Sequence, residues 1–265
     1  MGREVGRGGL AGEDREVGRG GLVGEELPGR HNELAAQVIV IAKEPVPGRV
    51  KTRLTPPFTP QEAARLAEAA LADTLAAVAA APVARRVLAL AGTPGPWLPP
   101  GFDVIAQGAG GLDQRLGRAF EDAYAGRALP TVLIGMDTPQ VTPSLLTEAV
   151  TPLVTGEADA VFGSASDGGF WLLGLSRPDA GLIAGVPMSA GDTGRIQLER
   201  LTGAGLRVRA VPELIDVDTR DDAARVAALI PGSRFADALD RATAPLRDAP
   251  DGKGRHLTGH AAKRC

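Results

Sequence analysis

The stretch from Val38 to Leu54 constrains the fold most, because an apolar run stops abruptly there in a loop of unusual composition. Val38–Ala42 is dense in β-branched residues, which is typical of a strand buried on both faces in a parallel sheet. The loop that follows carries two prolines, a glycine and four cations. Open α/β sheets bind ligands at the carboxyl ends of their strands. The sequence therefore predicts that this loop holds phosphates.

Two cations of the loop, Lys51 and Arg53, are the strongest candidates for contact with an anion. Residues two apart in an extended segment point the same way, so both could address one anionic group, the arginine as a planar fork and the lysine as a point charge. Such side chains could instead form an ordinary solvated basic turn.

Residues 3–14 recur almost unchanged as residues 15–26, and this glycine-rich, charged duplication cannot bury a core. We therefore expect residues 1–36 to be disordered, a single domain over 37–239, and a disordered tail over 240–265.

The composition is that of a globular protein, with 44% hydrophobic residues, 23% charged residues and a net charge of −3. The sole cysteine is Cys265, which excludes internal disulfides and thiolate metal clusters and fits a reducing cytoplasm. No apolar run is long enough to cross a bilayer. A sequence pI near 5.7 does not support a general nucleic-acid role.

Strand and helix signals alternate along the chain. Thr59–Glu62 is a capping box with proline at the first helical position, and it predicts a helix to Ala80. Strands are expected at Arg86–Ala91 and Asp103–Gln107. This alternation predicts a three-layer α/β domain with a mostly parallel sheet and one antiparallel excursion around Phe170–Leu175.

Glycines precede the next helix, which is expected to run to about Tyr124. Such a start can present free backbone N–H groups to an anion, so Gly110, Gly111 and Arg115 are candidates for nucleotide binding. The segment could equally be a flexible turn.

Asp137 lies two residues beyond a buried strand, Thr131–Gly135, at the same sheet edge as the basic loop. The clustered charge of a nucleoside di- or triphosphate is bridged by Mg²⁺ or Mn²⁺, and such cations take carboxylate oxygen together with phosphate oxygen. Asp137 could instead cap the helix near Pro143, although Thr142 is better placed to do so.

Two further segments place carboxylates near strand ends. Asp167, Gly168 and Gly169 form a tight turn in which the glycines would let backbone approach a substrate and Asp167 would accept its hydrogen bonds, although such a D-G-G hairpin is also a common turn. Asp218 follows the strand expected at Leu206–Val211 and precedes Thr219, which with Asp222 could simply cap the last helix.

These motifs resemble those of one family. The pattern A-K-x-P-x-P-G-x-V-K-T-R-L, followed by G-x-D-x-P, D-G-G-F and D-V-D-T, resembles the DUF2064 family, also known as rSAM/selenodomain-associated transferase 1, and covers about 38–230. That family is related to GT-A glycosyltransferases and to MobA-like and CofC-like nucleotidyltransferases. The chain departs from the family's W-S-T-P-x-V segment, having Met188 and an inserted Gly-Asp before Thr193, which leaves the acceptor open.

The resemblance implies a GT-A (nucleotide-diphospho-sugar transferase, Rossmann-like) fold. It implies a Mg²⁺ or Mn²⁺ ion held by Asp137 and Asp218, catalytic roles for Lys51, Arg53 and Asp137, and substrate contact at Asp167, Gly168 and Gly169. It also implies nucleotide contacts from a larger set: Ala42, Lys43, Gly48, Arg49, Gly110, Gly111 and Arg115.

Two reactions fit these residues. In glycosyl transfer a nucleoside diphosphate leaves a sugar that passes to a small acceptor, and in nucleotidyl transfer a phosphorylated small acceptor attacks a nucleoside triphosphate and pyrophosphate leaves. A third possibility is a nucleotide-binding protein without turnover. The base, sugar, acceptor and oligomeric state cannot be inferred from the residues.

Overall fold

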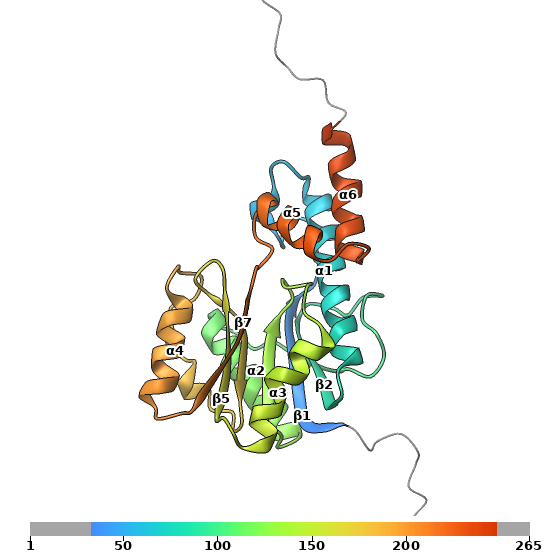
Figure 1. Cartoon of the computed structure of the whole chain (residues 1–265). Helices are drawn as coiled ribbons and strands as arrows, with labels where there is room; N and C mark the ends of the chain where they lie inside the picture. The colour runs from blue at the N-terminus through green and yellow to red at the C-terminus, as the bar shows by residue number, and fades with distance from the viewer. Residues whose placement is uncertain (1–32, 248–265) are drawn as a thin grey trace, which may run out of the picture. The chain divides into compact units, whose positions relative to one another are not determined.

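A computed structural model describes residues 33–247, in which helices cover both faces of a seven-stranded sheet (Figure 1). The strand order is β3-β2-β1-β4-β6-β5-β7. The strands are β1 (Leu34–Lys43), β2 (Val83–Ala91), β3 (Asp103–Ala106), β4 (Thr131–Gly135), β5 (Ala160–Ala165), β6 (Phe170–Leu175) and β7 (Val208–Leu214).

Most of the sheet is parallel, as the sequence predicts. β1 pairs in parallel with both β2 and β4, so the carboxyl ends of these strands lie at one edge. β6 runs antiparallel to β4 and β5, and it is the predicted antiparallel excursion. The α/β fold with a mostly parallel mixed sheet is therefore confirmed.

The helical elements are η1 (Thr52–Leu54), α1 (Pro60–Ala80), α2 (Leu112–Gly126), α3 (Pro143–Thr155), η2 (Ala180–Leu182), α4 (Thr193–Gly203), α5 (Arg220–Leu229) and α6 (Arg234–Arg247). Three of the longer helices begin at a threonine whose side chain accepts a hydrogen bond from the first turn. Thr59 and Glu62 form the predicted capping box of α1, Thr142 caps α3, and Thr219 with Asp222 caps α5.

The three layers follow from the alternation of side chains along β1. Val38 and Val40 pack into the hydrophobic cluster that contains residues of α1 and α3. Ile39, between them, packs into the opposite cluster with residues of α2 and α4. Because successive strand residues face opposite sides, a continuous apolar strand such as β1 is covered on both faces.

A third cluster joins α1 to α5 and α6, which lie together beyond the sheet edge in Figure 1. Phe235 and Leu239 of α6 are buried in it. The helix continues to Arg247, so the domain boundary predicted at 239 is too early. At the other end β1 begins at Leu34, and Ala36 is already buried, so the boundary predicted at 36 is too late. The expected disorder of 1–32 and 248–265 lies outside the described residues.

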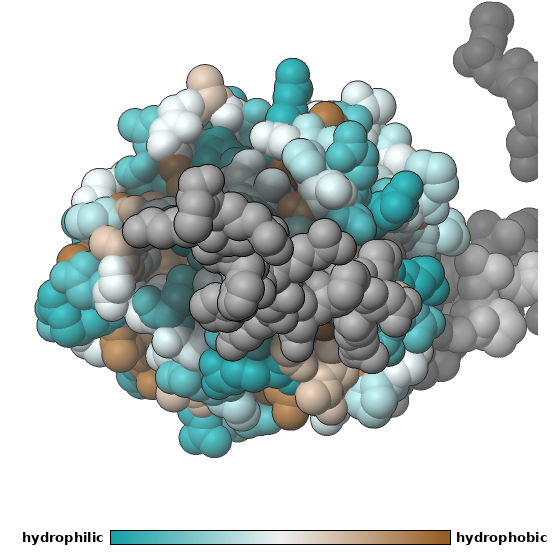
Figure 2. Space-filling model, turned by 90° about the horizontal axis from the view of Figure 1, so that it is seen from above, coloured by the Kyte–Doolittle hydropathy of each residue, from teal (hydrophilic) through white to brown (hydrophobic). Residues whose placement is uncertain are grey.

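The surface of the described part is mostly polar. Its exposed large hydrophobic side chains are Val104, Leu198 and Leu229, which come from three different elements. Figure 2 shows hydrophobic residues scattered among hydrophilic ones on the visible part of the face seen from above. Within residues 33–247, none of the helices combines the length and the apolar character that crossing a bilayer requires.

Candidate active site

A cleft of about 490 Å³ opens at the carboxyl ends of β1 and β4. Its walls come from the loop after β1, the start of α2, the end of β4, the start of β6, and the segment between β7 and α5. The predicted site residues that line it are Ala42, Lys43, Arg49, Lys51, Arg53, Arg115, Asp137 and Asp218.

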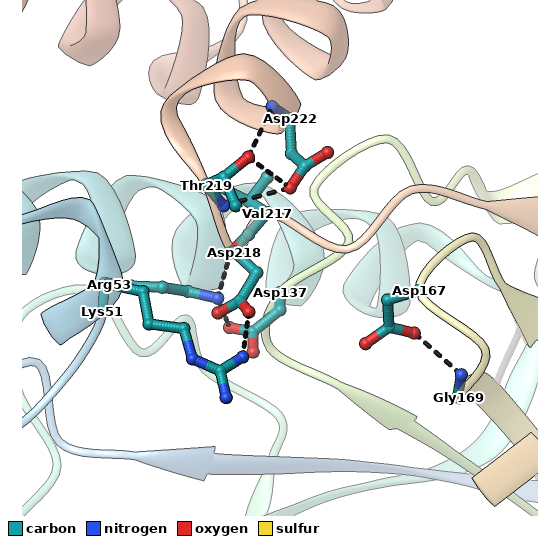
Figure 3. A network of polar contacts seen from close by, with 9 residues as sticks. All are labelled: Lys51, Arg53, Asp137, Asp167, Gly169, Val217, Asp218, Thr219 and Asp222. Atoms are coloured by element: carbon teal, nitrogen blue, oxygen red, sulfur yellow. Dashed lines mark hydrogen bonds and ion pairs between the residues drawn. The ribbon is translucent and has the colours of Figure 1, made fainter. Parts of the chain in front are cut away.

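Lys51 connects three of these segments. Its side chain is 8% exposed, and its Nζ lies 3.0 Å from Asp137 Oδ1. The same ammonium donates a hydrogen bond to the carbonyl oxygen of Val217 (Figure 3). Lys51 also has a left-handed backbone, with φ 48° and ψ 39°, which costs energy for a residue with a side chain and is common at functional sites.

Arg53 forms an ion pair with Asp218 rather than joining Lys51 on one target. The hydrogen bond and the charge of Asp218 raise the pKa of the Arg53 guanidinium. The predicted extended segment is wrong here, because Lys51 is left-handed and Thr52–Leu54 forms a turn of 3₁₀-helix. Both cations still line the cleft, each beside a different carboxylate.

The two predicted metal ligands, Asp137 and Asp218, both line the cleft, and their side chains are drawn in Figure 3. Asp137 is not needed as a helix cap, because Thr142 caps α3. Its carbonyl oxygen accepts a hydrogen bond from the Val217 amide at 3.0 Å, which brings the 215–218 segment to the end of β4. Asp218 is not a cap either, since Thr219 and Asp222 cap α5.

Asp216 lines the same cleft and was missed by the sequence reasoning. Burial, together with the charges of Asp137 and Asp167, raises the pKa of its carboxyl to about 7. The sequence pattern that could have identified Asp216 is Asp216-Val-Asp218, because side chains two residues apart in an extended segment point to the same side.

Arg115 reaches the cleft from α2, held by a second residue that the sequence reasoning missed. Gln107 donates to the carbonyl oxygens of Ala42 and Ala89, at the ends of β1 and β2, and accepts from Arg115 Nη1 at 3.0 Å. Gly110 and Gly111 do not line the cleft; Gly110 has φ +102° and Gly111 is the residue before the helix.

The glycines at 48, 168 and 169 also lie outside the cleft lining. Gly48 has φ +76° in the turn after β1. Gly168 has φ +88°, and a Cβ on it would lie 2.0 Å from the carbonyl oxygen of Gly191. Gly194 N donates to Gly168 O at 2.8 Å. The close approach that Gly168 permits is therefore to the 191–194 segment.

Asp167 accepts a hydrogen bond from Gly169 N at 2.8 Å, so part of its bonding capacity closes its own turn. It is absent from the cleft lining, and Figure 3 shows it apart from the other carboxylates. Its charge nevertheless contributes to the raised pKa values of Asp216 and Arg53.

The donor set fits a hard cation that is shared with a ligand. Among residues 33–247 no group of three or more Asp, Glu, His or Cys side chains is arranged to hold a metal ion. Two carboxylates, those of Asp137 and Asp218, nevertheless line the cleft. Mg²⁺ typically takes one or two carboxylates and completes its shell with phosphate oxygens and water, so Asp137 and Asp218 are the residues that could hold such an ion together with a bound phosphate.

A second hollow of about 500 Å³ lies between α1, α6 and the loop around Trp97. None of the predicted site residues lines it. Its lining includes alanines of both helices, among them Ala69 and Ala238.

The fold is that of the nucleotide-diphospho-sugar transferase class of α/β proteins. The chain is 25% identical to the crystal structure of a provisionally assigned nucleotide-diphospho-sugar transferase from Desulfovibrio desulfuricans G20, with a TM-score of 0.72, covering 80% of this chain and 97% of that one. Residues 64–190 match the family model DUF2064, described as an uncharacterized protein conserved in bacteria. No curated protein matches the sequence.

Two more distant structures are also similar. Rv0371c from Mycobacterium tuberculosis H37Rv, in complex with manganese, is 22% identical over 73% of this chain and 98% of its own, with a TM-score of 0.44. The 2-C-methyl-D-erythritol 4-phosphate cytidylyltransferase of Thermus thermophilus is 16% identical over 74% and 98%, with a TM-score of 0.45. Because both scores are below 0.5, neither likeness bears on the function of this chain.

Proposed function

We propose that this protein is a metal-dependent transferase that moves a glycosyl group from a nucleoside-diphosphate sugar to a small acceptor. The observation that carries the proposal is the Lys51–Asp137 and Arg53–Asp218 pairing at the cleft, where two cations and two carboxylates meet at the ligand edge of the sheet. The resemblance to the Desulfovibrio desulfuricans structure supports the same reaction class.

Each charged group has a distinct task in this proposal. Arg53, Lys51 and the neighbouring Arg49 neutralise the diphosphate as it departs, since charge-assisted bonds to phosphate are among the strongest that a protein makes. Asp137 and Asp218 hold Mg²⁺ or Mn²⁺, which supplies further neutralisation of the leaving group. Catalysis then comes from positioning and charge stabilisation, without a covalent intermediate.

The remaining predicted contacts surround this centre. Ala42, Lys43 and Arg115 line the cleft beside the diphosphate site and bind the nucleotide. Gly48, Gly110 and Gly111 contribute through the backbone of the turns that they form. Asp167, Gly168 and Gly169 lie on the acceptor side, where Asp167 accepts hydrogen bonds from the acceptor through the oxygen that its turn leaves free. The partners are small molecules, and the reaction takes place in the cytoplasm.

Nucleotidyl transfer is the second candidate, and the cations around the cleft favour it. Arg49, Lys51 and Arg53 all follow the first strand and line the cleft, where a departing pyrophosphate would need several positive charges. Nucleotide binding without turnover is the third.

One experiment separates the three. The protein is incubated with Mn²⁺ and nucleoside-diphosphate sugars, and separately with nucleoside triphosphates and phosphorylated small acceptors. Release of nucleoside diphosphate supports glycosyl transfer, release of pyrophosphate supports nucleotidyl transfer, and both releases should disappear in Asp137→Asn. Binding of a nucleotide without either release would leave the non-catalytic alternative.

A further inference from the structure

We infer that Gln140 is a positioning residue, which fixes the segment 215–218 so that the carboxylates of Asp216 and Asp218 lie opposite Asp137. This inference deepens the proposed function and rests on it for the effect on ligand binding. The position of the segment itself can be measured without any ligand.

Gln140 lies in the short connection between β4 and α3, three residues after Asp137. It is 9% exposed, and its Nε2 donates a hydrogen bond of 2.7 Å to the carbonyl oxygen of Ile215. A second bond joins the same two segments, from the Val217 amide to the carbonyl oxygen of Asp137 at 3.0 Å.

These two hydrogen bonds bracket Asp216. Ile215 is held on one side and Val217 on the other, both by the 137–140 segment, so the backbone of Asp216 is fixed at both ends. Asp216 and Asp218 line the cleft, whereas Gln140 does not. Gln140 therefore acts on the site through the backbone that carries the carboxylates.

The amide group of Gln140 serves as a donor. Its Oε1 is buried without a hydrogen-bond partner, and a buried unpaired acceptor is unfavourable. An apolar side chain of the same length would avoid that penalty, and what it would lose is the bond to Ile215.

Gln197 of α4 offers a matched control. It is 0% exposed, its Nε2 donates to Leu182 O at 2.8 Å, and its Oε1 is likewise buried without a partner. It does not line the cleft. Replacing either glutamine by methionine removes one buried side-chain donor and one unpaired acceptor, so the two variants should differ little in global stability.

The test compares Gln140→Met with Gln197→Met in the full chain by amide hydrogen exchange. Exchange of the Val217 amide should accelerate about tenfold in Gln140→Met, the equivalent of losing about 1.4 kcal/mol of local hydrogen bonding, and should not change in Gln197→Met. Gln140→Leu is the second variant if Gln140→Met does not fold. Unchanged Val217 exchange, or an equal acceleration in both variants, would overturn the inference.

The consequence for the site is measured by calorimetry with pyrophosphate and Mn²⁺. Affinity should fall about tenfold in Gln140→Met and stay at the wild-type value in Gln197→Met. If the wild-type protein binds no pyrophosphate, the proposed function loses support while the exchange result still decides the role of Gln140. If exchange of the Val217 amide accelerates but pyrophosphate affinity is unchanged, Gln140 holds the segment but does not position its carboxylates. The inference would then be wrong.

Discussion

The Lys51 ammonium lies 3.0 Å from Asp137 Oδ1, and the lysine side chain is 8% exposed while that of the aspartate is 40% exposed. The cation is thus the enclosed partner, and the carboxylate still reaches the cleft. Lys51 also donates to Val217 O, and its charge opposes the rise in the pKa of Asp216, so the ammonium offsets the negative charge of both Asp137 and Asp216. A metal ion at Asp137 would have to share this carboxylate with Lys51.

Replacing Lys51 by methionine should therefore strengthen the binding of Mn²⁺ alone while lowering turnover. Removing a unit charge beside a carboxylate raises the negative potential, and the gain in Mn²⁺ affinity should be on the order of tenfold. Electron paramagnetic resonance of free Mn²⁺ measures it without nucleotide. Lys43→Met is the control, because Lys43 also lines the cleft but forms no ion pair with Asp137 in the described structure. Equal affinities in both variants and the wild type would refute the competition.

Arg53→Lys should keep stability and lose turnover. The Arg53 side chain is 70% exposed, and exposed ion pairs contribute little to stability, so the free energy of unfolding should change little. Lysine cannot make the bidentate contact of a guanidinium with a phosphate. If that contact strengthens in the transition state, kcat should fall more than nucleotide affinity does. Steady-state kinetics and calorimetry together check this. An unchanged kcat would mean that Arg53 is a solvated surface cation without a role in catalysis.

Gly168→Ala should destabilise the domain more than the same substitution does at a glycine of positive φ that has free space around it. At φ +88° a Cβ would lie 2.0 Å from Gly191 O, a backbone atom, and the turn would have to move. The expected loss in the free energy of unfolding is more than about 2 kcal/mol, by denaturant titration. Gly156→Ala is matched, with φ +77° and no atom within 4 Å of the new Cβ, and should cost about 1 kcal/mol. Equal losses would show that the clash relaxes.

The sequence predicts elements well where the signal is local. The capping box of Thr59 and Glu62 depends on neighbouring residues, and both it and the helix that follows are found as expected. The end of α6 was missed because its charged residues mask a helical spacing of buried side chains, Phe235, Leu239 and Ala242, whose partners lie on α1 and α5.

The site was harder to predict because it depends on distant contacts. Asp137 could be placed from its strand, but the raised pKa of Asp216 depends on its burial and on the charges of Asp137 and Asp167, which are far away in the sequence. The glycine pair at 168 and 169 suggested contact with substrate, whereas the structure shows the backbone of 191–194 there. The left-handed backbone of Lys51 had no local signal, since neither proline nor glycine occupies that position.

The pair Asp159 and Arg207 should give the protein a stability contribution that is lost in acid. Hydrogen bonds from Arg207 lower the pKa of the Asp159 carboxyl from 3.8 to about 2. Because the folded-state pKa is depressed, the contribution is present above pH 4 and disappears as the pH falls towards 2. The difference in the free energy of unfolding between wild type and Asp159→Asn should shrink over this window. A constant difference would mean that the carboxylate charge does not stabilise the fold.

Asp137→Asn and Asp218→Asn should each abolish most metal-dependent activity without unfolding the domain. Neither residue caps a helix: Thr142 caps α3, and Thr219 with Asp222 caps α5. Loss of activity in Asp218→Asn could therefore not be attributed to a weakened helix. Thr219→Ala is the control, because it removes the cap of α5 alone and should cost about 1 kcal/mol of stability.

If both carboxylates hold one ion together with the ligand's phosphates, they act as a unit, and the double variant should be little worse than either single one. Calorimetry with nucleotide, with and without Mg²⁺, measures the binding side of the same cycle. Should Asp218→Asn keep full metal-dependent binding and turnover, its ion pair with Arg53 is the whole of its role, and Asp137 is the protein's single carboxylate on the metal. Should the two losses instead add, the carboxylates act independently, and Asp218 would serve to orient the Arg53 guanidinium towards the phosphates.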